Sequence, residues 1–279
     1  MNFDGPVPGI PGAVIRSVDE LPEHLPDAKP AGQFSQAKPG QLLLAVPHIA
    51  RLLVRDGKRI EVAAEPDADP GAVTLLLYGS ARGALIHQCG ELPLHAATLV
   101  PPGGDAAIAI CGVSGAGKSV LAVELSSRGW VLVADDATRV TWNGAHAMAW
   151  PSRDSIKLWR DACEASDMDI ATLQRVSLTV DKYYLRVATR EEPARLAAVV
   201  ELLVDGGGQG DRTALSSGEK MAVLTRHAYR QSYIRPLGRQ ADFARVVARV
   251  AGACRITRLA GARVRPARDL ADAIERIVQ

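Results

Sequence analysis

The chain of 279 residues is 47% hydrophobic and 23% charged, which is enough to bury a core as one large domain or as one domain with a small appendage. Its 33 basic residues stand against 31 acidic residues, and a net charge of +2 without a concentrated basic face argues against nucleic acid as a partner. No apolar run reaches the roughly 18 residues that a membrane-spanning helix needs, so we expect no membrane partner.

Residues 1–40 are rich in proline and glycine, which predicts loops and a frayed terminus. Three apolar runs come next and predict short strands, with a turn at Asp56-Gly57 between the last two. The strands are expected at Gln41–Val46, Ile49–Val54 and Arg59–Ala63. This part of the chain therefore predicts a β-rich fold.

A helix is expected over Val73–Cys89, although Gly79 and Gly83 are unfavourable inside a helix. We predict a small β-rich module over residues 1–82 and a larger domain over residues 83–279. The sequence of the module by itself indicates no function.

Two further strands are predicted at Leu94–Val100 and Ala106–Cys111, on either side of the turn-forming cluster Pro101–Asp105. If they form a hairpin, the numbers of paired residues sum to about 206, which puts His95 opposite Cys111; a slip of one residue would turn His95 to the other face. A single histidine is more often structural. The expected position at the mouth of the next loop nevertheless makes His95 a candidate functional residue.

The segment Gly112-Val-Ser-Gly-Ala-Gly-Lys118-Ser119 matches the phosphate-loop pattern G-x-x-x-x-G-K-[ST]. A predicted strand precedes it and a helical run, Ser119–Arg128, follows it, which is the context that the motif requires. Glycines let the backbone turn tightly so that its N–H groups surround an anion, and the helix N-terminus adds a favourable dipole. The loop is therefore expected to bind the phosphates of a nucleoside triphosphate.

The residues of this loop have expected roles with ATP and Mg²⁺ as cofactors. Lys118 would reach the β- and γ-phosphates, and the Ser119 hydroxyl would hold the metal ion. The predicted nucleotide-binding residues are Gly112, Ser114, Gly115, Ala116, Gly117, Lys118, Ser119 and Val120.

A buried strand is expected at Val131–Ala134, after Gly129 has ended the helix, and it leads into Asp135 and Asp136. We predict a parallel strand in a βαβ crossover, so that its end and the phosphate loop lie at the same edge of the sheet. Two adjacent aspartates can also simply cap the next turn. If a Mg²⁺-nucleotide binds beside them, one aspartate would contact the metal and the other would contact the hydroxyl group of the acceptor.

The remaining elements alternate between strands and helices. Asn143-Gly144 is typical of a hairpin turn, and Gly206–Gly210 predicts a loop that lacks the spacing and the lysine of a second nucleotide site. Arg226 and Arg230 are expected on one helix face. The elements are the strand pair Val140–Trp142 and Ala145–Trp150, the loop Pro151–Trp159, the helix Lys157–Ala165, the strands Asp181–Leu185 and Ala197–Val204, the helices Ser217–Arg230 and Ala241–Ala251, the strand Cys254–Leu259 and the helix Ala267–Val278.

The cysteines and the N-terminus predict a cytoplasmic protein. Cys89, Cys111, Cys163 and Cys254 form no C-x-x-C pair, so they indicate reduced thiols and neither a disulfide framework nor a zinc site. The N-terminal segment lacks a basic stretch followed by an apolar one, and we expect no signal peptide.

Three stretches together resemble the HPr kinase/phosphorylase family: His95 on a strand, the phosphate loop Gly112–Ser119, and Arg128-Gly-Trp-Val-Leu-Val-Ala-Asp-Asp136. Leu92-Pro-Leu-His-Ala, Ile156-Lys-Leu-Trp159 and the region from Gly40 to Gly57 look more like the related enzymes of lasso-peptide gene clusters. Those enzymes phosphorylate a serine near the C-terminus of a peptide precursor. The resemblance implies an α/β phosphate-loop kinase of the HPr kinase/PEP-carboxykinase-like type, with a mixed central sheet and flanking helices.

The leading hypothesis is an ATP-dependent serine kinase whose partner is a serine-containing peptide or small protein. Asp135 would take the acceptor proton, His95 would position Asp135 or the transferring group, and Ser119 and Asp136 would hold the metal. The alternatives are an HPr(Ser) kinase/phosphorylase, a small-molecule kinase or nucleotide-hydrolysing switch, and a non-catalytic ATP-dependent peptide-binding module. The L-E-x-R-G segment of HPr kinases is absent, and a homo-oligomer is left open.

Overall fold

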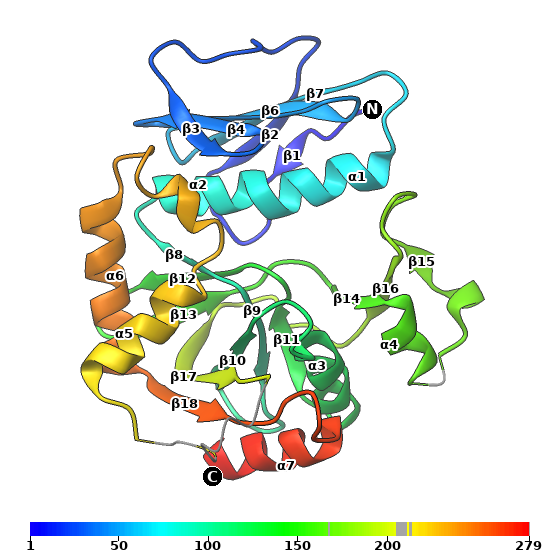
Figure 1. Cartoon of the computed structure of the whole chain (residues 1–279), viewed down its shortest axis with the longest axis vertical. Helices are drawn as coiled ribbons and strands as arrows, with labels where there is room; N and C mark the ends of the chain where they lie inside the picture. Colours follow the sequence, from blue (N-terminus) through cyan, green and yellow to red (C-terminus); the bar gives the residue numbers. More distant parts are fainter. Residues whose placement is uncertain (167, 205–210, 212–213, 279) are drawn as a thin grey trace. The chain divides into compact units, whose positions relative to one another are not determined.

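Apolar strands alternate with helices along most of the chain, and they assemble into a mixed α/β structure. The computed structural model describes residues 1–166, 168–204, 211 and 214–278 (Figure 1). These residues form two compact units. The first is Met1–Pro93 with Arg175–Lys182 and Tyr229–Val246, and the second is Leu94–Gln174 with Tyr183–Ala228 and Val247–Gln279. The first unit therefore contains the predicted module of residues 1–82 and extends beyond it; the predicted boundary stays a prediction.

The sheet of the first unit has the strand order β1-β2-β7-β6-β5-β4-β3. Its strands are β1 (Gly5–Pro6), β2 (Val14–Ser17), β3 (Lys29–Gly32), β4 (Ser35–Lys38), β5 (Gln41–Val46), β6 (Ala50–Arg55) and β7 (Arg59–Ala64). The last three confirm the predicted strands, and Asp56 and Gly57 turn between β6 and β7 with positive φ angles. The prediction of loops over residues 1–40 is wrong, because four short strands lie there. Pro6 and Pro30 are tolerated because β1 and β3 are the edge strands.

The predicted helix over Val73–Cys89 is confirmed and begins three residues earlier, as α1 (Pro70–Leu75), the π-helical turn η1 (Leu76–Ala81) and α2 (Arg82–Gln88). The carboxylate of Asp69 caps its N-terminus by accepting from the Gly71 N–H. A Cβ atom on Gly79 or Gly83 would come within 3.1 or 2.9 Å of the Tyr229 side chain. The glycines that disfavour the helix locally therefore make room for this ring.

His87, on α2, is expected to make the stability of the first unit depend on pH. Burial lowers its pKa from 6.5 to about 4, although hydrogen bonds to the backbone of Tyr229 and Arg230 raise it. As the pH falls, the His87 imidazole of the unfolded chain binds a proton before that of the folded chain does. The contribution of neutral His87 to the free energy of unfolding is therefore complete above pH 6.5 and is lost as the pH falls toward 4. The loss is about 3 kcal/mol at 1.36 kcal/mol per pKa unit.

Chemical denaturation at pH 7.5 and pH 4.5 tests this expectation with the wild type and a His87→Gln variant. The variant should show a smaller decrease in the free energy of unfolding between the two pH values. An equal decrease in both proteins would show that His87 is not responsible.

The central sheet of the second unit contains the order β11-β9-β10-β17-β13-β12, and β18 pairs with β17. β10 is parallel to β17, and β17 is parallel to β18. The strands are β9 (Ala96–Val100), β10 (Ala106–Gly112), β11 (Val131–Ala134), β12 (Thr138–Trp142), β13 (Ala147–Trp150), β17 (Ala194–Leu202) and β18 (Arg255–Leu259). The mixed sheet that the resemblance implies is thus present.

Helix α3 (Lys118–Ser127) packs beside α7 (Ala267–Val278) within this unit (Figure 1). Arg128 joins them, because its guanidinium binds Glu124 as well as Asp272 and Glu275 of α7. The apolar faces of both helices enter the core that includes Ile110, Leu121, Val200 and Ile274. The remaining elements are β8 (Leu92–Leu94), β14 (Ser155–Trp159), α4 (Arg160–Glu164), η2 (Ile170–Thr172), β15 (Gln174–Arg175), β16 (Lys182–Arg186), α5 (Ser217–Arg226), η3 (Gln231–Tyr233) and α6 (Gln240–Ala253).

Two predictions about strand pairing need correction. β11 does not pair with β10, because β9 lies between them and is antiparallel to both. β10 and β11 still run in the same direction, so both end at the same edge of the sheet. The observed hairpin register pairs Cys111 with Ala96, one residue away from the predicted partner His95.

Two predicted helices are also shorter than expected. The predicted helix Lys157–Ala165 begins only at Arg160, because Ile156 and Leu158 are buried in alternation with Lys157 and belong to β14. Helix α5 ends at Arg226 with His227 as its C-cap residue, and Arg230 has a left-handed φ of 54°. Arg226 and Arg230 therefore do not share a helix face.

No helix in the described part of the chain is both long and apolar enough to cross a membrane. The predicted glycine-rich loop Gly206–Gly210 lies outside the described residues.

Candidate functional site

The predicted phosphate loop joins the end of β10 to the start of α3 and has the backbone that its motif requires. Gly115 and Gly117 have left-handed φ angles of 78° and 82°, and Gly117 is the N-cap residue of α3. A Cβ atom on Gly112 would lie 3.0 Å from the Cβ of Ala116 and 3.2 Å from the carbonyl oxygen of Leu202. Even an alanine at position 112 would therefore press the loop away from β17. These features fit a loop whose amides surround phosphate.

Lys118 is the first residue of α3, and its side chain turns back over the loop. Its Nζ donates to the carbonyl oxygens of Gly112 at 2.8 Å and Val113 at 3.2 Å. The other predicted nucleotide-binding residues lie in the exposed turn of the loop or in the first turn of α3: Ser114, Ser119 and Val120. The Lys118 ammonium group therefore lies close to the backbone of the phosphate loop, where it could bind a phosphate group in the loop.

Four side chains form a second part of the site, which we call the carboxylate cluster: His95, Asp135, Asp136 and Lys157. Asp135 and Asp136 follow β11 at the sheet edge where β10 enters the phosphate loop. Asp136 Oδ1 lies 3.5 Å from His95 Nε2, and Asp136 Oδ2 accepts from Lys157 Nζ at 2.5 Å. The backbone N–H of Lys157 donates to Asp135 Oδ2 at 3.0 Å. The sequence-predicted residues His95, Asp135 and Asp136 are thus brought together.

Two groups of the cluster have shifted pKa values. Burial and the positive charge of Lys118 lower the pKa of His95 to about 4, against the carboxylate of Asp136, which raises it. Burial raises the pKa of Asp135, while the charge of Lys157 opposes this shift. His95 is therefore neutral near pH 7, and the field of Lys118 connects the cluster to the phosphate loop. A carboxylate with a raised pKa beside a phosphate loop is a candidate general base.

The site has fewer metal ligands than a dedicated metal centre. Within the residues that the structure describes, no group of three or more His, Cys, Asp or Glu side chains is arranged to hold a metal ion. Magnesium bound to a nucleotide needs only one or two protein ligands, since the phosphates and water supply the rest. Ser119 and Asp136 fit that limited role by chemistry. Because Lys157 already binds Asp136, a metal ion there would compete with its ammonium group.

Two basic residues of this region lie in places that the sequence does not predict. Lys157 was expected at the start of a helix, whereas in β14 it contacts both aspartates. Arg263 lies in the turn after β18, and its Nη2 is 4.0 Å from where a Cβ on Gly115 would lie. The alternation of Ile156, Lys157 and Leu158 is the signal that indicates the strand.

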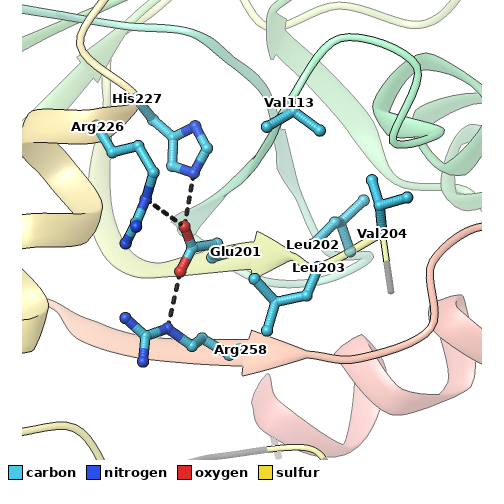
Figure 2. A pocket seen from close by; sticks show the side chains of 8 residues that line it. All are labelled: Val113, Glu201, Leu202, Leu203, Val204, Arg226, His227 and Arg258. Carbon is cyan, nitrogen blue, oxygen red and sulfur yellow. Dashed lines mark hydrogen bonds and ion pairs between the residues drawn. The ribbon is translucent and has the colours of Figure 1, made fainter. Parts of the chain in front are cut away.

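A cavity of about 540 Å³ adjoins the phosphate loop on the β17 side (Figure 2). Its lining combines apolar residues with an ionic group. One of the apolar residues is Val113 of the phosphate loop, which is 53% exposed. The lining residues are Val113, Glu201, Leu202, Leu203, Val204, Arg226, His227 and Arg258. The volume lies in the range of ligand pockets, roughly 300–1,000 Å³.

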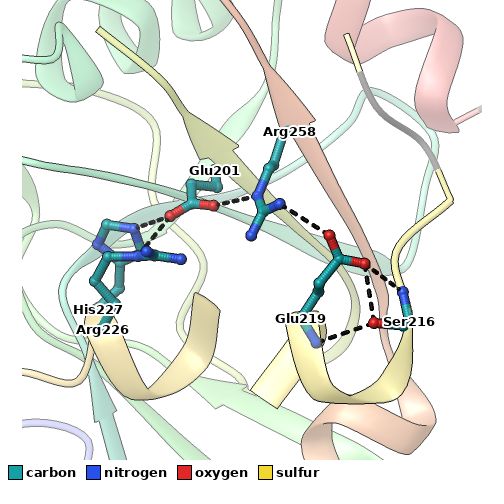
Figure 3. A network of polar contacts seen from close by, with 6 residues as sticks. All are labelled: Glu201, Ser216, Glu219, Arg226, His227 and Arg258. Atoms are coloured by element: carbon teal, nitrogen blue, oxygen red, sulfur yellow. Dashed lines mark hydrogen bonds and ion pairs between the residues drawn. The ribbon is translucent and has the colours of Figure 1, made fainter. Parts of the chain in front are cut away.

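Glu201 is the centre of the ionic group and was also missed by sequence reasoning. Its side chain is 2% exposed, yet its Oε1 accepts from Arg226 Nε at 3.1 Å and His227 Nε2 at 2.8 Å, and its Oε2 accepts from Arg258 Nε at 2.8 Å (Figure 3). Burial alone would raise the pKa of Glu201, but these hydrogen bonds and charges lower it to about 2. Glu201 is therefore ionised at any physiological pH.

The comparisons with known proteins find similarity among solved structures and none among sequences. The sequence matches no protein-family model and no curated protein. Among solved structures, the chain is similar to the Hpr(Ser) kinase/phosphatase from Coxiella burnetii, at a TM-score of 0.35 and 15% sequence identity. The similarity covers 67% of this chain and 93% of that chain.

Proposed function

We propose that this chain is an ATP-dependent kinase that phosphorylates a serine hydroxyl of a peptide or small protein, with a lasso-peptide precursor as the expected acceptor. The observation that carries the proposal is the carboxylate cluster, whose Asp135 and Asp136 follow β11 at the sheet edge where β10 enters the phosphate loop. Nucleotide binding alone needs no such cluster, whereas transfer to a weakly nucleophilic alcohol benefits from a positioned base.

The proposal assigns the phosphates to the loop amides and Lys118. Ser119 and Asp136 would hold Mg²⁺, which neutralises phosphate charge when it is bound. Most of the barrier reduction in phosphoryl transfer comes from such a cationic cradle, because the transition state carries negative charge on the phosphoryl oxygens.

Asp135 is the proposed general base. It accepts the hydroxyl proton as the serine oxygen bonds to the γ-phosphorus, whose bond to the β,γ-bridging oxygen breaks with ADP as the leaving group. The backbone N–H of Lys157 donates a hydrogen bond to one oxygen of Asp135. In the same cluster, the neutral imidazole of His95 lies beside the carboxylate of Asp136. The cavity beside Val113 gives room for the side chains that flank the acceptor serine.

Incubation with Mg-ATP and a serine peptide tests the proposal. Mass spectrometry is expected to show one added phosphoryl group on the serine peptide and none on a peptide in which alanine replaces the serine. Release of free phosphate without a peptide product would support a nucleotide hydrolase instead. Binding of ATP without any turnover would support a non-catalytic binding module.

A further inference from the structure

We propose that Glu201 is a positioning residue for the phosphoryl transfer described above and that it acts on His95 through His227; this inference rests on the proposed function. Two hydrogen bonds form the connection. The imidazole Nε2–H of His227 donates to Glu201 Oε1 at 2.8 Å, and the carbonyl oxygen of the same residue accepts from the backbone N–H of His95 at 2.8 Å. A single residue, His227, therefore links Glu201 to His95 of the carboxylate cluster.

The residue before His95 contacts the same segment. This residue, Leu94, forms an isolated antiparallel bridge with Ala228, the residue after His227. The chain therefore enters the cluster along the segment that leaves α5, and the position of the His95 side chain follows the position of this segment. A shift of that segment would move the imidazole relative to Asp136, whose Oδ1 lies 3.5 Å away.

Glu201 holds both ends of α5. At the C-terminal end, Arg226 and His227 bind its Oε1 directly. At the N-terminal end, Arg258 bridges from Glu201 to Glu219 at 3.3 Å, and Glu219 forms a capping box with Ser216 (Figure 3). One buried carboxylate on β17, the strand that pairs with the phosphate-loop strand, thus fixes where this helix ends.

Burial of the Glu201 carboxylate costs desolvation free energy, which is consistent with a role in fixing the position of α5. Glu201 is the second-to-last residue of β17, between Val200 and Leu202, and its side chain is 2% exposed, so an apolar side chain could be buried here without any need for partners. A buried ion pair often stabilises a protein no better than apolar residues do, and it is more useful for fixing one arrangement. Here the arrangement that it fixes is the approach of the His227 backbone to His95.

A double-mutant cycle tests the proposal. Glu201→Gln is expected to lower kcat about 10- to 100-fold with little change in the KM for ATP, because misplacement by about 1 Å can cost on the order of 10²-fold. In a His95→Ala background the same substitution should have no further effect on kcat. A purely structural Glu201 would lower kcat by the same factor in both backgrounds, and this result would overturn the proposal.

Glu219→Gln is the matched control. It removes a carboxylate from the same ionic network at the other end of α5, and glutamine preserves the capping box. This variant is expected to keep the wild-type kcat. A kcat reduced as strongly as in Glu201→Gln would mean that the network stabilises α5 in general and does not act on His95. If Glu201→Gln does not fold, His227→Ala replaces it in the same cycle, because Glu201 then keeps both arginines.

A second measurement separates this inference from the proposed function. The NMR chemical shifts of the His95 imidazole at pH 7.5 report where the ring lies relative to its neighbours. Glu201→Gln is expected to change these shifts, whereas Glu219→Gln is expected to leave them as in the wild type. Unchanged His95 signals in Glu201→Gln would overturn the inference even in an active kinase, whereas changed signals in a protein without kinase activity would reject only the proposed function.

Discussion

Asp135→Asn is expected to lower the rate of phosphoryl transfer by about 10²- to 10⁴-fold, the usual contribution of a general base, and to leave the affinity for ATP nearly unchanged. The amide oxygen of asparagine can still accept the hydrogen bond from the Lys157 N–H, so the geometry of the cluster should persist. What is lost is the group that takes the acceptor proton. Single-turnover kinetics with the serine peptide and calorimetric titration with ATP measure the two quantities separately.

Two further variants make this result specific. Asp105→Asn changes an aspartate in the exposed β9–β10 turn, at the other end of β10 from the phosphate loop, and should transfer phosphate at the wild-type rate. Asp136→Asn should weaken the dependence on Mg²⁺, because Asp136 is a proposed metal ligand. An Asp135→Asn variant that transfers phosphate normally would reject Asp135 as the base.

The phosphate loop could be predicted because its geometry is local. The glycines at positions 115 and 117 supply left-handed backbone within a few residues of one another, and a strand and a helix adjoin them directly. The carboxylate cluster depends on longer-range pairing and was predicted less accurately. The register is shifted by one residue and β11 pairs with β9, yet His95 still meets Asp136, because it lies in the junction between β8 and β9 and not within a strand.

The ionic group around Glu201 could not be predicted from the sequence. A glutamate inside the apolar run Ala197–Val204 is locally a single polar residue in a strand, and nothing adjacent to it indicates a partner. Its partners are 25, 26 and 57 residues away in the chain, at Arg226, His227 and Arg258. Such contacts arise only when α5 and β18 have packed beside β17.

Lys118→Met is expected to lower kcat/KM for ATP by about 10²- to 10³-fold, the typical cost of removing one group that stabilises developing charge. The variant loses the ammonium group that would bind the β- and γ-phosphates. It also loses the two bonds from Nζ to the carbonyl oxygens of Gly112 and Val113, so the loop itself is expected to loosen. Steady-state kinetics measure the first effect, and thermal unfolding with and without Mg-ATP measures the second.

A second consequence of the same substitution separates an electrostatic role of Lys118 from a merely structural one. The positive charge of Lys118 lowers the pKa of His95, so Lys118→Met should raise that pKa, whereas Lys118→Arg should keep it low because the charge remains. Lys58→Met, in the β6–β7 turn of the first unit, is the control for loss of a lysine elsewhere. If Lys118→Met left the His95 titration unchanged, the phosphate loop and the carboxylate cluster would be electrostatically independent, and the electrostatic role of Lys118 would be rejected.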